Sequence, residues 1–344
     1  MNPYLKDILS QPEALRAALR NFSVAPLDPI IQRIGKHEFD RILITGMGAS
    51  YNAAYPAFLQ LTSQPLPVML ANTAELLHYS TGLISSRTLL WMNSQSGRSV
   101  ELVRLTEKTQ SNPPGCILAC VNDVSSPLAL AVEVCIPIHA GVEATVSTRT
   151  YLNMLAVNLL AAITLSGDDP SSVIPQLLSA ATAMEQYLSN WQVHVAELDA
   201  RLGEVKGLVI LGRGASLAAV WNGSLISKEA AKCAFEGMHV ADFRHGPLEL
   251  ASPDLTVLMF EGAQQTARLN RELAVEVARL GGHVLWLAQE ADADLPTLRL
   301  PAVDEIALPL VEILPLQMLT ILMAQRKGIE PGKFRHVPKI TLQE

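Results

Sequence analysis

The sequence predicts an α/β protein with two tandem domains, each built on a doubly wound parallel sheet flanked by helices. The 344 residues exceed what one ordinary core accommodates. A strand-like run, a glycine turn and an Ala-rich helical stretch occur at Arg41–Ala54 and again at Gly207–Val220, with the glycine turns 166 residues apart. Strands that alternate with helical stretches are typical of parallel sheets joined by crossover helices.

The same spacing continues along both halves of the chain. Three further pairs of strand-like runs lie 168, 167 and 172 residues apart. They are Thr88–Met92 with Thr256–Phe260, Cys116–Cys120 with His283–Leu287, and Cys135–Ile138 with Ala307–Leu310. Both halves are therefore expected to place their strands in the same order.

This repeat sets the expected domain boundaries. Residues 1–35 are interpreted as a helical lead-in, 36–167 as the first domain, 168–203 as a helical connector, 204–326 as the second domain and 327–344 as a tail. The turn at Asp168–Ser172 contains Pro170, a residue that is common where a helix begins.

Composition excludes several partners. The net charge is -7 and no Lys/Arg-rich run is present, so no nucleic acid or membrane surface is expected as a partner. The apolar stretch Tyr151–Leu165 is shorter than the roughly 20 residues of a bilayer span. The N-terminus shows no secretory signal, which favours a cytoplasmic protein. The four cysteines lack metal-ligand spacing and are expected to be buried free thiols, so no metal is predicted.

A hydroxyl-rich loop follows the strand that ends at Met92. Ser94, Gln95, Ser96 and Ser99 lie there, directly before a helical segment. Backbone N–H groups at a helix N-terminus, together with hydroxyl donors, bind phosphate without any lysine or arginine. The matching loop of the second half, Glu261–Thr266, begins with a carboxylate, so only the first domain is expected to bind phosphate. The alternative is that these serines are only turn and capping residues.

Groups suited to proton transfer occur only in the second half. Lys228 and Glu229 continue the helix after the second glycine turn, and His245 lies in a Gly-Pro loop. The alternative is a surface ion pair and a solvated histidine. In the tail, Lys339 follows Pro338; such a lysine either frays with its segment or docks over a site, where it can form a Schiff base.

Together these motifs resemble the sugar isomerase (SIS) family, in particular the isomerase half of glucosamine-6-phosphate synthase, over nearly the whole chain. The family's phosphate loop Ser-Gln-Ser-Gly-x-Ser/Thr is matched at 94–99 and its Gly-x-Ser-Tyr-Asn turn at 48–52. Its Lys-Glu pair, its His-Gly-Pro loop and its lysine-bearing tail are matched at 228–229, 245–247 and 335–344. The segment 143–149 is similar to a further family motif, but is one residue shorter.

The resemblance implies a role for each matched residue. Glu229 is the base that moves a proton between C1 and C2, His245 opens the sugar ring, and Lys339 forms the Schiff base. In the family the histidine comes from the neighbouring subunit, which implies a homodimer. The residues that the resemblance assigns to the sugar phosphate are Ser50, Ser94, Gln95, Ser96, Ser99, Thr145 and Ser147.

Two departures shape the expected reaction. Ile226 stands where the synthase has a second lysine, and position 2 is Asn rather than the nucleophilic Cys of a glutaminase domain. We therefore expect isomerisation of a sugar 6-phosphate, or deamination of glucosamine 6-phosphate to fructose 6-phosphate and ammonia. Alternatives are a sugar-phosphate sensor and a deglycase acting on a glycated-amine 6-phosphate. No cofactor is expected, because neither glycine turn has the third glycine of a dinucleotide fingerprint.

Overall fold

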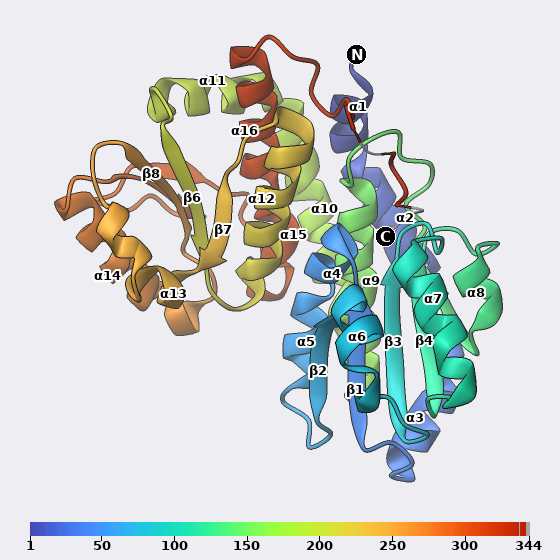
Figure 1. Cartoon of the computed structure of the whole chain (residues 1–344). Helices are drawn as coiled ribbons and strands as arrows, with labels where there is room; N and C mark the ends of the chain where they lie inside the picture. Colours follow the sequence, from blue (N-terminus) through green and yellow to red (C-terminus); the bar gives the residue numbers. More distant parts are fainter. Residues whose placement is uncertain (337, 342–344) are drawn as a thin grey trace. The chain divides into compact units, whose positions relative to one another are not determined.

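The computed structural model describes residues 1–336 and 338–341, and the chain divides into two compact units. The first unit contains residues 13–143, 147–175 and the tail from Arg335 onward. The second contains residues 1–12, 144–146 and 176–334. Each unit is built around one five-stranded parallel sheet (Figure 1).

The sheet of the first unit has the strand order β2-β1-β3-β4-β5, with every neighbouring pair parallel. Its strands are β1 (Arg41–Gly46), β2 (Val68–Asn72), β3 (Thr88–Ser94), β4 (Cys116–Val121) and β5 (Val134–Pro137). The central strands are buried on both faces, as expected for continuous apolar runs in a covered parallel sheet.

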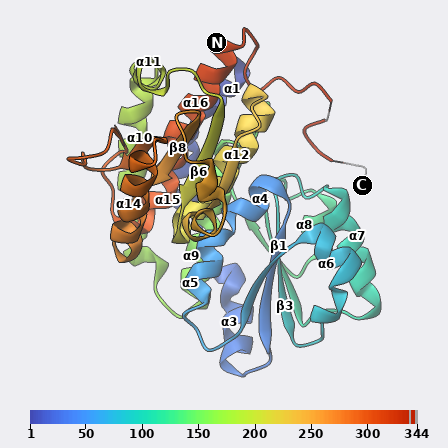
Figure 2. The same cartoon turned by 60° about the vertical axis from the view of Figure 1, so that its left-hand side comes forward.

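Helices cover both faces of this sheet. Its helices are α2 (Gln11–Asn21, whose first two residues belong to the second unit), α3 (Asp28–Gly35), α4 (Gly48–Ala53), α5 (Tyr55–Leu61), α6 (Thr73–Tyr79), α7 (Val100–Lys108), α8 (Pro127–Ala131) and α9 (Arg149–Leu165). Figure 2 shows α6, α7 and α8 on one face and α5 and α9 on the other. Leucines of α6, α7 and α8 pack against alternate residues of β1, β3 and β4.

The second sheet repeats this topology. Its order is β10-β9-β8-β6-β7. Read from the β7 end, with β6 counted as the first strand, this is the order of the first sheet. The strands are β6 (Gly207–Gly212), β7 (Glu236–His239), β8 (Leu255–Phe260), β9 (His283–Ala288) and β10 (Thr297–Arg299). The predicted fold class, with two doubly wound parallel sheets in tandem, is confirmed.

Residues 176–203 of the expected connector belong to the second unit and residues 168–175 to the first. The helices of the second unit are α1 (Pro3–Leu9), α10 (Ile174–Ser189, whose first two residues belong to the first unit), α11 (Trp191–Leu202), α12 (Leu217–Ala231), α13 (Val240–Arg244), α14 (Gln264–Arg279), α15 (Leu308–Val311) and α16 (Ile313–Arg326). Valines and a tryptophan of the sheet pack against α13 and α14, and α12 packs against α16. The helical stretch Glu305–Arg326 is long and apolar enough for a membrane span, but 94% of its apolar window is buried, as in a core helix.

One predicted strand is wrong. Residues Ala307–Leu310 are helical, because η7 (Glu305–Ala307) and α15 occupy them. Pro309 lies in the first turn of α15, where its fixed φ suits a helix and its missing N–H costs nothing. The strand that completes the second sheet is β10, which is only 3 residues long.

Candidate active site

The first sheet has a topological switch point at the carboxyl ends of β1 and β3. These strands are neighbours, but the chain continues from β1 to β2 on one side and from β3 to β4 on the other. Open α/β sheets bind ligands at such a switch point. Because Gly46 pairs with Asn93, the glycine turn after β1 and the serine loop after β3 begin side by side.

In the glycine turn, the backbone at Gly46 lies too close to neighbouring backbone atoms for a larger side chain. A Cβ on Gly46 would lie 3.2 Å from the Asn93 carbonyl oxygen and 3.0 Å from the Tyr51 nitrogen. Gly48 has φ +50°, in the left-handed region that favours glycine. Ser50 follows in the first turn of α4, half-buried, and its hydroxyl has no hydrogen-bond partner within residues 1–336 and 338–341.

In the serine loop, two hydroxyls organise the backbone. The Ser94 Oγ accepts a hydrogen bond from the Gly97 N–H at 3.0 Å, and the Ser96 Oγ accepts one from the Arg98 N–H at 3.1 Å. Each hydroxyl keeps its own hydrogen to donate. Ser99 is the N-cap residue of α7 and makes no side-chain capping bond, so its hydroxyl is available at the helix N-terminus.

Gly97 allows the serine loop to pack directly against Ser126. Its φ is +61°, and an added Cβ would lie 2.0 Å from the Ser126 Oγ. Ser126 in turn accepts a hydrogen bond from the Ala129 N–H at the start of α8, so it is held in place. The packing therefore requires the glycine of the motif.

The tail reaches this loop in the first unit. The Val100 N–H, at the first position of α7, donates to the Thr341 carbonyl at 3.2 Å. The Lys339 Nζ contacts the backbone carbonyl of Glu143 and lies 3.4 Å from its carboxylate. Lys339 is thus brought into the same unit as Ser50, Ser94–Ser99 and Ser147.

Glu143 also holds the start of α9. Its Oε1 accepts from the Thr148 N–H at 2.8 Å and from the Thr150 N–H at 3.1 Å, and its Oε2 accepts from the Thr150 hydroxyl at 2.7 Å. Ser147 shares a hydrogen bond of 2.7 Å with the same threonine hydroxyl. Sequence reasoning did not identify Glu143 as the partner of Lys339, because 196 residues separate them.

Thr145 lies in the second unit, with residues 144–146. Its Oγ1 is buried and has no hydrogen-bond partner among the residues that the structure describes. A Cβ on Gly332 would lie 3.1 Å from this oxygen. Thr145 and the serine loop therefore belong to different units.

Glu229 and His245 are also in the second unit. Glu229 is half-buried near the C-terminal end of α12, which returns the chain from the carboxyl edge of the second sheet to its amino edge. His245 is exposed and follows α13, which begins where β7 ends at the carboxyl edge. Figure 1 shows α13 and the end of α12 that leads into β7 at opposite ends of that strand.

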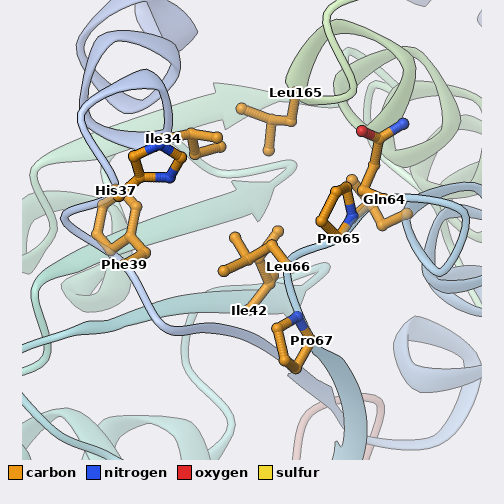
Figure 3. Close-up of a pocket in the computed structure, with 10 residues that line it drawn as sticks. Ile34, His37, Phe39, Ile42, Gln64, Pro65, Leu66, Pro67 and Leu165 are labelled. Carbon is orange, nitrogen blue, oxygen red and sulfur yellow. The ribbon is translucent and has the colours of Figure 1, made fainter.

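A separate apolar pocket of about 240 Å³ lies at the other end of the first sheet. Ile42 at the start of β1, Pro67 just before β2 and Leu165 at the end of α9 line it (Figure 3). Because the serine loop follows the opposite ends of the strands, this pocket is not the phosphate site.

Comparison with known proteins identifies the repeat. Residues 37–164 and 202–325 each match the SIS domain family. A glutamine–fructose-6-phosphate aminotransferase (isomerizing) of Pyrococcus horikoshii is 28% identical over 99% of this chain. The chain spans 57% of the length of that relative.

Solved structures share the fold at low identity. The C-terminal domain of glucosamine-fructose-6-phosphate aminotransferase from Francisella tularensis has a TM-score of 0.80 and 19% identity, and the match covers 97% of this chain and 98% of that one. Glucosamine-6-phosphate deaminase from Thermotoga maritima has a TM-score of 0.77 and 18% identity, covering 98% and 99%. Tagatose-6-phosphate ketose/aldose isomerase from Escherichia coli has a TM-score of 0.79 and 18% identity, covering 97% and 96%.

Proposed function

Since the chain belongs to the SIS domain family, we propose that it is a phosphosugar isomerase or deaminase acting on a sugar 6-phosphate, most readily glucosamine 6-phosphate. One observation carries this proposal above the others. The serine loop meets the N-terminus of α7 beside the β1 glycine turn, and Lys339 belongs to the same unit.

Phosphate binding rests on hydroxyls and the helix terminus. Ser94, Ser96 and Ser99 donate to the phosphate oxygens, with the Gln95 amide, while the N-terminus of α7 supplies a positive dipole end. This arrangement suits a chain of net charge -7, because it needs no cationic side chain at the phosphate. Ser50 donates to the sugar from the glycine turn, and Thr145 and Ser147 are the remaining binding residues.

The proposed chemistry is proton transfer followed by loss of the amine. His245 moves the proton that opens the ring, and Glu229 takes the C2 proton and delivers it to C1. The product is a C2 imine. The Lys339 amine adds to that carbon, ammonia leaves, and water then releases fructose 6-phosphate and restores the lysine. Hydrolysis of glucosamine 6-phosphate thus consumes one water and releases one ammonia.

We favour deamination over plain isomerisation because the tail places the Lys339 amine in the same unit as the serine loop, and an amine that adds to C2 is needed for loss of ammonia but not for proton transfer between C1 and C2. Since the exposed His245 and the half-buried Glu229 lie toward opposite edges of the second sheet, we further propose a two-fold dimer in which the partner supplies the histidine.

The test follows ammonia and fructose 6-phosphate over a panel of amino-sugar, ketose and glycated-amine 6-phosphates, with wild type and Glu229→Gln. The variant keeps the size of the side chain but loses the base. We expect wild type to release both products from glucosamine 6-phosphate. The variant should bind the sugar in calorimetry but no longer exchange its C2 proton with deuterated water. Retained exchange would place the base elsewhere, and release only from glycated amines would identify a deglycase.

A further inference from the structure

Lys232 ends α12 in a backbone conformation that an L-residue adopts at a cost. Its φ is +55° and its ψ is 38°, in the left-handed region. Glycine is the residue that usually ends a helix in this conformation, because it has no Cβ to clash. The backbone conformation alone therefore does not favour lysine here.

The Lys232 side chain joins two segments of the second unit. Its Nζ donates to the Glu229 carbonyl and, at 2.9 Å, to the Lys333 carbonyl. The first acceptor belongs to the proposed catalytic base. The second belongs to the segment that follows α16 and continues into the tail.

Two more bonds tie the same pieces of chain together. The Gly332 N–H donates to the Ala230 carbonyl at 3.2 Å, and the Lys327 Nζ donates to the Lys232 carbonyl at 2.7 Å. Carbonyl groups at a helix C-terminus lack intrahelical partners. Here residues 327–333 and the Lys232 amine supply those partners, so the last turn of α12 and the segment before the tail form one hydrogen-bonded unit.

We propose that Lys232 is a positioning residue: its amine fixes the last turn of α12, and with it Glu229, to the segment 327–333 from which the tail bearing Lys339 begins. The inference rests on the proposed function for the roles of Glu229 and Lys339. It adds a residue that touches no substrate but sets the direction of the base and the starting point of the tail. A base displaced by about 1 Å can lose a large factor in rate.

The test compares Lys232→Gly, Lys232→Ala and Lys232→Arg. Glycine and alanine both remove the amine, but glycine also relieves the left-handed strain, so Lys232→Gly should melt about 2 °C above Lys232→Ala. If the amine positions Glu229, both variants lose about tenfold in kcat, with less effect on KM. Lys232→Arg, which keeps a cationic donor, should restore most of that loss.

The matched control is His37→Gly. His37 has φ +57°, follows the C-cap residue of α3 in the first unit and lines the apolar pocket, so the change relieves the same kind of backbone strain with kcat unchanged. If Lys232 were only a helix cap, kcat would instead follow stability, and Lys232→Gly would retain more activity than Lys232→Ala. Wild-type kcat in Lys232→Gly overturns the positioning role and leaves the proposed function standing.

Hydrogen exchange gives a measure that needs no substrate. Amides of residues 327–336, including the bonded Gly332 N–H, should exchange about tenfold faster in Lys232→Gly and Lys232→Ala than in wild type. Unchanged exchange would show that the Lys232 amine does not hold the segment 327–333 to the end of α12. Wild type that turns over no sugar phosphate would contradict the proposed function, and with it any part of Lys232 in the reaction. If exchange still accelerates in the variants, the Lys232 amine anchors the segment before the tail all the same.

Discussion

Two serine hydroxyls perform two tasks each in the phosphate loop. Ser94 and Ser96 accept hydrogen bonds from loop amides and can still donate to a ligand. The loop conformation and the ligand donors thus come from the same side chains. Ser99 differs, because its hydroxyl makes no capping bond and can serve the ligand alone.

This difference makes Ser99→Ala the cleaner test of the phosphate loop. The variant removes one donor to the phosphate and leaves the loop bonds intact, so Kd for fructose 6-phosphate should rise about 3- to 10-fold with Tm unchanged, as expected for one hydrogen bond. Ser96→Ala should also lower Tm, because it leaves the Arg98 N–H without its acceptor. Ser125→Ala, at an exposed serine bonded to Asp123, is the control. Unchanged affinity of Ser99→Ala in calorimetry would remove the phosphate-loop assignment.

Single residues show where sequence reasoning succeeds and where it stops. Ser94, Gly97 and Ser99 were predictable because a short local pattern, a strand followed by a helix start, contains them. Lys232 and Glu143 were not. The importance of Lys232 depends on a left-handed backbone that the sequence around it does not reveal, and Glu143 meets Lys339 only through the fold.

Among the elements, burial decides which strands were predictable. β3 and β8 are buried along their whole length and read as continuous apolar runs. β2 and β7 contain no fully buried residue and β10 contains one, so these strands were not predicted, whereas β5, with two buried residues out of four, was. The error at Ala307–Leu310 has a related cause, since a buried apolar run of four residues looks the same in a strand and in a helix.

The N-terminus of α16 holds a buried carboxyl that links stability to pH. Glu312 occupies the N-cap position of this helix but makes no side-chain capping bond, and its Oε1 accepts a hydrogen bond from the Ser216 hydroxyl at 2.7 Å. Its Oε2 has no hydrogen-bond partner in the described part of the chain. Burial raises the pKa of Glu312 to about 8, from 4.5, with the Ser216 bond opposing the shift.

Glu312 should therefore lower stability as the pH rises. Above about pH 4.5 the unfolded chain loses this proton while the folded chain keeps it up to about pH 8, so the unfolding free energy falls through that window by up to about 1.4 kcal/mol per pH unit. Glu312→Gln stays neutral throughout and should melt above wild type at pH 8 but close to it at pH 4.5. Thermal unfolding across this range measures the effect, and Glu290→Gln, at an exposed carboxylate, is the control. Parallel melting curves for Glu312→Gln and wild type would contradict the buried-proton assignment.

In the whole molecule, two sheets of one topology have acquired different loops. At the N-terminus of α7 the Val100 N–H donates to the neutral Thr341 carbonyl at 3.2 Å, and the Ser99 hydroxyl makes no capping bond. At α14, the matching helix, the Gln264 N–H donates to the Glu305 carboxylate at 2.9 Å. The second domain thus places a negative charge of its own at this helix N-terminus, whereas the first domain places only a neutral carbonyl there. This supports the expectation that only the first domain binds the sugar phosphate.

The dimer proposal predicts that two inactive variants repair one another. If each site takes Glu229 from one chain and His245 from the other, a dimer of His245→Ala with Glu229→Gln contains one site with both residues native. Random exchange makes about half of the dimers mixed, each with one of two sites repaired, so about a quarter of wild-type activity should return.

The control separates this arrangement from a general rescue by mixing. Glu229 and Lys339 are assigned to one chain of each site, so Glu229→Gln mixed with Lys339→Ala leaves every site defective, and no activity should return. Mass spectrometry of differently labelled chains confirms that subunits have exchanged. If exchange is complete and the His245 mixture stays inactive, the histidine acts within its own chain or has no part in the reaction. Recovery in both mixtures would instead place Lys339 and Glu229 on different chains.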